Sequence, residues 1–228
     1  MSAGSPPVDV IVPVHNAAEF LGEALESVLA QDYRPLRIIV IDDGSTDESG
    51  EIAAGFPNVL LIRQENQGPA AARNAGLAAA EAPYIALHDA DDLLPPHKLT
   101  TQMRYLEEHP EVACVLARQE WIDPPPWLPR DVLYGDLGGI PTPSAVFRAE
   151  PLRKLGGFDS SFRTGEDMDL LIRFREADLE IVVLPDVLLY RRYHGSNLSV
   201  ARGLPENRIR SLKAKLDRER LAQGREDA

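Results

Sequence analysis

The feature that most constrains this chain is a regular succession of apolar runs rich in Val, Ile and Leu. The first four begin near residues 8, 36, 59 and 84, and helix signals come after each of the first three. Runs without polar alternation are typical of strands covered on both faces, and strands alternating with helices indicate consecutive βαβ units. The 228 residues therefore predict a single α/β domain with a Rossmann-like, mostly parallel sheet flanked by helices.

Helix-start signals lie between the strands. Asn16 with Glu19, and Ser45 with Glu48, have the spacing of a capping box and predict two helix starts. Pro69 suits the first turn of an Ala-rich helix that reaches about residue 81. The remaining elements are expected as helices over 97–108, 151–155 and 166–177, strands near 114 and over 144–148, 180–184 and 187–193, and a proline-rich loop over 120–143.

Charge and cysteine content exclude several classes. With 24 basic and 36 acidic residues, the net charge of −12 is the opposite of a nucleic-acid-binding surface. Cys114 is the only cysteine, so an internal disulfide or a cysteine-built zinc site is excluded, and we expect it in a buried strand. No apolar run reaches about 18 residues and no targeting signal opens the chain, which predicts a cytoplasmic protein.

Carboxylates gather where two of the predicted strands end. Asp42 and Asp43 come after the second strand, and Asp89, Asp91 and Asp92 come after the fourth. Ligands of open parallel sheets bind at these ends, and clustered carboxylates favour a divalent cation with oxygen ligands. The alternative for any single Asp is a turn residue.

Several motifs occur in a fixed order along the chain. They are Val10-Ile11-Val12-Pro13-Val14-His15-Asn16, Ile41-Asp42-Asp43-Gly44-Ser45-Thr46-Asp47, Asn66-Gln67-Gly68 with Ala72-Arg73-Asn74, and Asp89-Ala90-Asp91-Asp92. Together they resemble the nucleotide-sugar half of the family 2 glycosyltransferases, which have the GT-A fold. Gly156-Gly157-Phe158-Asp159 and Gly165-Glu166-Asp167-Met168-Asp169-Leu170 resemble the acceptor half of that family.

The resemblance covers about residues 8–200. It implies a nucleotide-sugar half over about 8–95 and an acceptor half over 96–200, between a flexible N-terminus (1–7) and a helical tail (201–228). Donor-binding residues carried over by resemblance are Pro13, His15, Asn16, Asp42, Gly68, Arg73, Asp89 and Ala90. Asp91, Asp89 and His194 would bind the cofactor, Mn²⁺ or Mg²⁺.

Purely structural roles remain open for these residues. Asp42 would accept a hydrogen bond from a uracil-type N–H, or cap the next helix. Arg73 would approach the diphosphate, or be a solvated helix charge. We interpret Asp92 as a cap for the segment after it, and His194 is either a metal or phosphate contact or a structural histidine.

The chemistry implied by the resemblance needs a proton acceptor. We expect Asp167 to be the general base, with Glu166 beside it for acceptor hydroxyls or orientation, in a single displacement that inverts the anomeric centre. The alternative is that both are favourable charges in the first turn of a helix.

Two absences bear on the type of transferase. The Gln-x-x-Arg-Trp signature and spanning helices of processive synthases are missing, which favours transfer of single sugars, with UDP as the favoured nucleotide. The acceptor would be a glycan, a lipid-linked molecule or a small molecule. Trp121, Trp127 and Tyr134 would stack on a sugar or pack against the sheet.

Other functions compete with sugar transfer. A catalytically silent sugar-nucleotide-binding module is the main alternative, and a sugar nucleotidyltransferase comes next. A haloacid dehalogenase-type phosphatase needs Asp-x-Asp where this chain has Asp42-Asp43, and a dinucleotide-binding dehydrogenase needs Gly-x-Gly-x-x-Gly, which is absent.

The tail predicts an amphipathic helix over 205–221. Ile209, Leu212 and Leu216 recur at helical spacing beneath a face rich in Arg and Lys. This helix would pack on the domain or on a second subunit of a homodimer, or bind peripherally to an anionic membrane that carries a lipid-linked acceptor.

Overall fold

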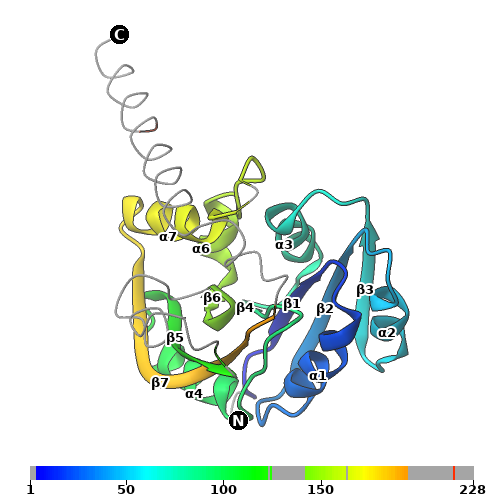
Figure 1. Cartoon of the computed structure of the whole chain (residues 1–228). Coiled ribbons are helices and arrows are strands. Elements are labelled where there is room, and N and C mark those ends of the chain that lie inside the picture. The colour runs from blue at the N-terminus through cyan, green and yellow to red at the C-terminus, as the bar shows by residue number, and fades with distance from the viewer. Residues whose placement is uncertain (1–3, 123, 125–141, 163, 195–217, 219–228) are drawn as a thin grey trace.

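The strands form one seven-stranded sheet, with helices in the connections between them (Figure 1). The computed structural model describes residues 4–122, 124, 142–162, 164–194 and 218. The strands are β1 (Val8–Val14), β2 (Leu36–Asp43), β3 (Val59–Gln64), β4 (Tyr84–Leu87), β5 (Val112–Ile122), β6 (Val146–Arg148) and β7 (Glu180–Arg192). The helices are α1 (Ala18–Leu29), α2 (Ser49–Gly55), α3 (Pro69–Ala79), α4 (Lys98–Glu108), the 3₁₀ turn η1 (Thr142–Ser144), α6 (Ala149–Lys154) and α7 (Glu166–Glu176).

The sheet is mostly parallel, as the sequence predicts. Its order is β3-β2-β1-β4-β6-β5-β7. The first four strands of the chain are parallel, with Val8 in register with Leu36 on one side and Tyr84 on the other. Among the described strands, only β6 runs antiparallel to its two neighbours. The carboxyl ends of β1, β2 and β4 therefore meet at one edge of the sheet.

Helices cover both faces of the sheet (Figure 1). Alternate residues of β1 point to opposite sides, so Val10 and Val12 join the core beneath α1, α2 and α4, whereas Ile11 joins the core beneath α3, α6 and α7. Cys114 is fully buried in β5, as predicted. The continuous apolar runs are explained by this double coverage.

The predicted helix caps are wrong. The first helix begins at Ala18, and Asn16 takes a left-handed backbone (φ 51°) instead of capping it. Caps come from the loop after β2: the Asp47 carboxylate accepts from the Ala18 amide at 3.0 Å, and the Ser49 hydroxyl accepts from the Ala17 amide at 2.9 Å. Helix α2 begins at Ser49, whose amide donates to Asp47 Oδ1 at 3.0 Å, so Ser45 does not cap it.

The strands predicted over 180–193 and the loop predicted over 120–143 both differ from the structure. The two strands predicted over 180–193 are one strand, β7, whose pairing with β5 shifts register where Pro185 and Asp186 are skipped. β5 extends into the predicted loop as far as Ile122. Residues 125–141 of that loop lie outside the described residues. The predicted tail helix also lies outside them except for Arg218, which is helical. In the described ranges, no helix has the length and hydropathy to cross a bilayer.

Candidate active site

The site begins with the loops after β1 and β2. His15 Nδ1 donates to the Asp43 carbonyl at 2.9 Å, and the Asn16 side-chain oxygen accepts from the Thr46 amide at 2.8 Å. Because Val14 is in register with Asp42, the two loops lie side by side. The predicted donor-binding residues Pro13, His15, Asn16 and Asp42 are therefore brought together.

Asp42 is nearly buried and closes its own turn. Its Oδ1 accepts from the Ser45 amide at 2.9 Å, and its Oδ2 lies 3.7 Å from the guanidinium of Arg63. This Asx turn is the local reason for an Asp at the end of β2. The Ser45 amide thus fixes one oxygen of the carboxylate, and Arg63 lies beside the other.

Asp43 organises the loop before α3, a role that the sequence did not predict. Its carboxylate accepts from the amides of Gln67 (2.9 Å) and Gly68 (2.8 Å) and from the side chain of Gln64 (2.7 Å). Gly68 has φ 91°, which favours glycine, and Pro69 comes next at the first helical position, as predicted. These bonds fix the start of α3 against the end of β2.

The acidic cluster after β4 is the strongest candidate for a metal centre. Carboxylate oxygens of Asp89, Asp91 and Asp92 all lie within 4.8 Å of one another. His194, just after β7, places Nε2 2.8 Å from Asp91 Oδ2, and its ring stacks on Phe20 at 4.6 Å between centroids. Ala90 is buried between the two acids. The structure thus brings the three predicted metal residues together.

Asp92 is not the cap that the sequence suggested. It is 2% exposed, and its Oδ1 accepts from the Arg192 amide at 3.1 Å. Burial, reinforced by the Asp91 charge, raises the pKa of Asp92 well above its usual value. Its Oδ2 is buried without a hydrogen-bond partner among the described residues, 3.7 Å from Arg191. Asp92 is therefore the buried member of the acidic cluster.

Arg73 is buried and joins the cluster to α7. Its guanidinium donates to Asp89 Oδ1 at 2.9 Å and to Glu166 Oε1, and only 6% of the residue is exposed. Burial opposes its charge, but Asp89 and Glu166 raise the pKa of Arg73, so it stays protonated. The alternative that Arg73 is a solvated helix charge is wrong.

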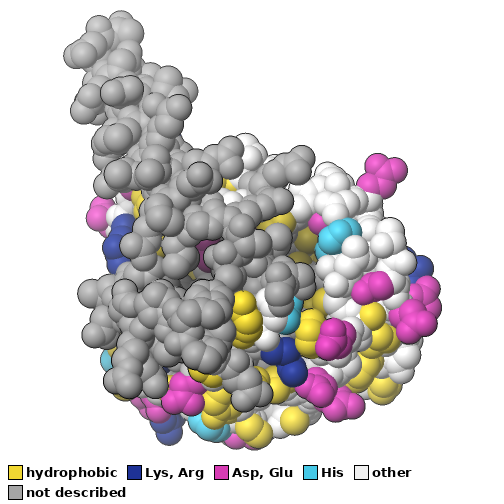
Figure 2. Space-filling view, viewed as in Figure 1, with side chains coloured by type: hydrophobic (Ala, Val, Ile, Leu, Met, Phe, Trp, Pro, Cys, Tyr) yellow, Lys and Arg dark blue, Asp and Glu magenta, His cyan; other side chains and the backbone are white. Residues whose placement is uncertain are grey.

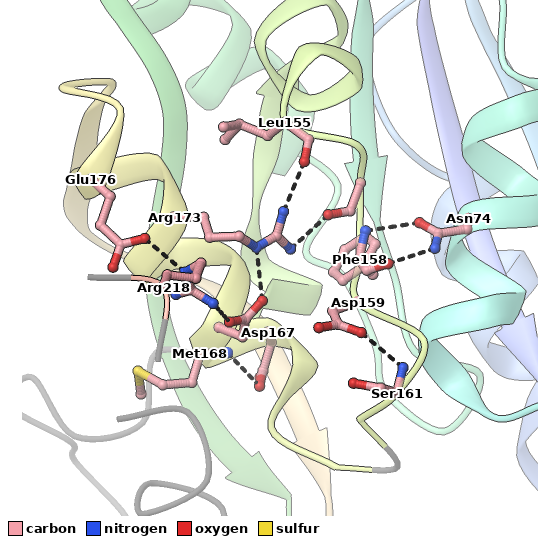
Figure 3. Close-up of polar contacts among 12 residues, drawn as sticks. Asn74, Leu155, Phe158, Asp159, Ser161, Asp167, Met168, Arg173, Glu176 and Arg218 are labelled. Atoms are coloured by element: carbon pink, nitrogen blue, oxygen red, sulfur yellow. Dashed lines mark hydrogen bonds and ion pairs between the residues drawn. The ribbon is translucent and has the colours of Figure 1, made fainter. Parts of the chain in front are cut away.

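The first turn of α7 carries the predicted catalytic carboxylates. Glu166 is nearly buried, and burial raises its pKa although Arg73 opposes the shift. Asp167 is half-buried, and its Oδ1 accepts from the Met168 amide at 2.8 Å (Figure 3). Asp169 is fully buried between two arginines, Arg173 at 2.7 Å and Arg218 at 2.8 Å, so it is inaccessible as a base.

Surface charge and aromatic contacts bear on how a donor could be held. On the face in Figure 2, acidic side chains are spread more widely over the described surface than basic ones. Trp121 is half-buried, and Arg191 lies over its ring at 4.7 Å, whereas Trp127 and Tyr134 lie outside the described residues. A diphosphate at this site would need cations close by.

Comparison with known proteins decides the family. The model of glycosyl transferase family 2 matches residues 9–158. The chain belongs to glycosyltransferase family 2. This family 2 chain is 39% identical over 106 residues to glycosyltransferase GlyG of Streptococcus pneumoniae, a stretch covering 44% of this chain and 35% of that protein.

Solved structures agree on the fold of this family 2 chain. S. aureus TarS 1–349 in complex with UDP-GlcNAc aligns with a TM-score of 0.74 and 21% identity over 86% of this chain and 61% of that one. Mannosyltransferase PcManGT from Pyrobaculum calidifontis, in complex with GDP-Man and Mn²⁺, aligns with a TM-score of 0.72 and 26% identity over 86% of this chain and 59% of that one. The expected GT-A architecture is confirmed. The chain spans about three fifths of these two structures and about a third of GlyG.

Proposed function

We propose that this protein transfers single sugars, with inversion, from a nucleotide-diphosphate sugar (UDP favoured) to an acceptor hydroxyl, using a divalent cation. The observation that carries the proposal is the position of Arg73 between Asp89 and Glu166. One buried guanidinium connects the carboxylates after β4 with those at the start of α7. The groups needed to hold a donor and to activate an acceptor therefore belong to one site.

The cluster fits a hard divalent cation. Asp89, Asp91 and Asp92 supply carboxylate oxygens within 4.8 Å of one another, and Asp92 Oδ2 is buried without a hydrogen-bond partner among the described residues. Oxygen ligands suit Mg²⁺ and Mn²⁺, and His194 adds a nitrogen beside Asp91. When bound, such a cation neutralises charge on the leaving diphosphate. PcManGT, solved with GDP-Man and Mn²⁺, supports this part of the proposal.

The acceptor hydroxyl would be activated by Asp167. Its partial exposure would give access to an acceptor, and its second carboxylate oxygen, which accepts no hydrogen bond from another described residue, would take the proton. The acceptor oxygen forms a bond to the anomeric carbon while the bond to the diphosphate oxygen breaks, and the electron pair leaves with the nucleoside diphosphate. The proton moves to Asp167. Glu166, held by Arg73, would orient the acceptor.

The partners and location are further parts of the proposal. The donor class is supported by neighbours solved with UDP-GlcNAc and with GDP-Man. The acceptor would be a glycan, a lipid-linked molecule or a small molecule, met in the cytoplasm or at the membrane surface. Single-sugar transfer is favoured because the Gln-x-x-Arg-Trp signature of processive synthases is missing from these 228 residues.

Metal-dependent donor binding is the direct test. Thermal unfolding would be measured with UDP, UDP-GlcNAc and GDP-mannose, each in Mn²⁺ and in EDTA. A ligand at about 100 times its Kd stabilises by about 2.7 kcal/mol, which for a chain of this size raises Tm by roughly 5–11 °C. We expect this shift in Mn²⁺ only, and its loss in Asp91→Asn.

The matched control is Asp178→Asn, because Asp178 is exposed and its left-handed backbone (φ 52°) tolerates Asn. It should behave as wild type. Equal shifts in Mn²⁺ and EDTA would refute metal dependence. If the protein binds a donor but releases no nucleoside diphosphate with any of a set of acceptors, the result would refute sugar transfer and favour a catalytically silent binding module.

A further inference from the structure

We propose that Asn74 and Arg173 are positioning residues. Together they fix the Gly156–Asp159 turn between α3 and α7, and so set the position of α7, the helix that carries Asp167, relative to the bound donor. The inference rests on the proposed function, since it concerns the placement of Asp167. Neither residue is assigned contact with a substrate. Both act through the turn.

The turn has a backbone that requires glycine. Gly156 and Gly157 have φ values of 80° and 70°, so two consecutive residues are left-handed. A Cβ on Gly157 would lie 2.5 Å from the side-chain oxygen of Asn74. The glycine is therefore needed twice, for its backbone angle and for the close approach of α3.

Asn74 holds the turn by both hydrogen-bonding groups of its amide. Its oxygen accepts from the Phe158 amide at 2.8 Å and its nitrogen donates to the Phe158 carbonyl at 2.7 Å (Figure 3). The two residues are 84 positions apart in the sequence. A single side chain of α3 thus pairs with the backbone of the acceptor half in the way that a neighbouring strand would.

Arg173 holds the same turn from α7. Its guanidinium donates to the carbonyls of Leu155 at 2.9 Å and Gly157 at 2.7 Å, while its Nε donates to Asp169 at 2.7 Å (Figure 3). Asp169 is fully buried and lies two residues after Asp167 on the same helix. The planar fork of Arg173 therefore fixes the start of α7 against the turn.

These contacts form a closed circuit with Arg73. The consecutive residues Arg73 and Asn74 reach α7 by two routes, one directly to Glu166 and one through the turn and Arg173. Two separate attachments oppose both sliding and rotation of α7 on α3. Displacing a reacting group by about 1 Å can cost on the order of 100-fold in rate, so the circuit bears on catalysis.

Two variants weaken the circuit, one on α3 and one on α7. Asn74→Ala removes both hydrogen bonds to Phe158, and Arg173→Lys keeps the charge beside Asp169 but loses the fork to the two carbonyls. The matched control is Arg153→Lys, because Arg153 on α6 also donates to a carbonyl near α3, that of Ala80, at 2.7 Å. Within the described part of the chain, the Arg153 side chain makes no hydrogen bond to the turn or to α7; its backbone carbonyl, which accepts from the Gly156 amide at 2.9 Å, is unchanged by the substitution.

The measurements use hydrolysis of UDP-GlcNAc, UDP-glucose and GDP-mannose, with water as acceptor, at least 10 °C below each variant's Tm. We expect kcat to fall at least tenfold in Asn74→Ala and in Arg173→Lys, with donor Kd changed less than threefold and the pH profile unmoved. Arg153→Lys should keep wild-type kcat. Gly157→Ala should also lower kcat, and combining it with Asn74→Ala should cost less than the product of the two single effects.

The outcomes separate the two proposals. A kcat within twofold of wild type in both variants, or a donor Kd that worsens in parallel with kcat, overturns the positioning role alone. Multiplicative effects of Gly157→Ala and Asn74→Ala also count against the circuit. A wild-type protein that binds these donors but releases no nucleoside diphosphate, either with water or with any of a set of acceptors, refutes the proposed function, and the positioning role with it.

Discussion

Replacing Arg73 by leucine should destabilise the protein in a pH-dependent way. Arg73 is 6% exposed and is paired with Glu166, whose side chain is 8% exposed, so the variant leaves a buried carboxylate without its cation. Breaking a buried pair by removing one partner costs about 3–5 kcal/mol. For a chain of this length, that lowers Tm by roughly 6–20 °C.

The sign of the pH dependence is set by Glu166. Burial already raises its pKa and Arg73 opposes that shift, so the variant's Glu166 pKa should rise further. A carboxyl with a raised folded-state pKa holds a proton more tightly in the folded state. The stability that this proton contributes is present below the unfolded pKa of about 4.3 and is lost as the pH rises through the folded pKa. The deficit against wild type should therefore be small near pH 4.5 and largest at pH 8.

Urea unfolding at pH 4.5, 6 and 8 in EDTA measures this deficit. Arg63→Leu is the control, because Arg63 is 56% exposed and its pair with Asp42 is long, so about 0–1 kcal/mol is expected at every pH. Adding Glu166→Gln to Arg73→Leu should recover part of the loss and flatten its pH dependence. A deficit of equal size at pH 4.5 and pH 8 would show that Glu166 is not the charge left unpaired in the interior, and the reasoning would fail.

Three other perturbations test separate features. Asp167→Asn cannot take a proton, so transfer should fall at least about 100-fold while calorimetry gives a donor Kd changed only a few-fold; near wild-type transfer would mean that the base lies elsewhere. Gly76→Ala should lower Tm, since its Cβ would clash with the Ile11 side chain and overpacking costs about 1–3 kcal/mol, whereas Gly22→Ala, with open space around it, should gain about 0.5–1 kcal/mol; matching thermal scans would contradict the packing of α3 on β1. Flotation with anionic liposomes should show no difference between the whole chain and a version lacking 205–228 if the tail packs on protein, and a loss of flotation on truncation would favour the membrane.

Local patterns predicted the strands and most helices well. β1 and β4 lie at the predicted residues because uninterrupted apolar runs such as Val10–Val12 can be satisfied only between two helical layers. The acids after β4 were predicted because strand ends in parallel sheets face the same edge, and the structure places Asp89 and Asp91 with His194 accordingly.

Contacts between distant segments could not be predicted from local pattern. Arg73 meets Glu166 93 residues away, and no periodicity in either helix indicates that pairing. Asp47 lies in one loop and caps the helix of the preceding unit, which a capping-box rule written for neighbouring residues cannot find. Asp92 resembled a turn residue, yet its role depends on β7, which pairs with it 100 residues later. The catalytic and donor-binding assignments themselves remain predictions.

The length of β7 sets the position of His194 relative to the acidic cluster. Its 13 residues start beside α7 and end at Arg192, two residues before His194, which contacts Asp91. Arg191 and Arg192 turn to opposite sides, toward Trp121 and Phe20. Inserting or deleting one residue after the irregularity at Pro185 would exchange those sides and displace His194 by about 3.3 Å. The spacing from Pro185 to His194 therefore sets a dimension of the proposed metal centre, and sequence changes that preserve every side chain of the cluster would still alter the site if they changed this distance.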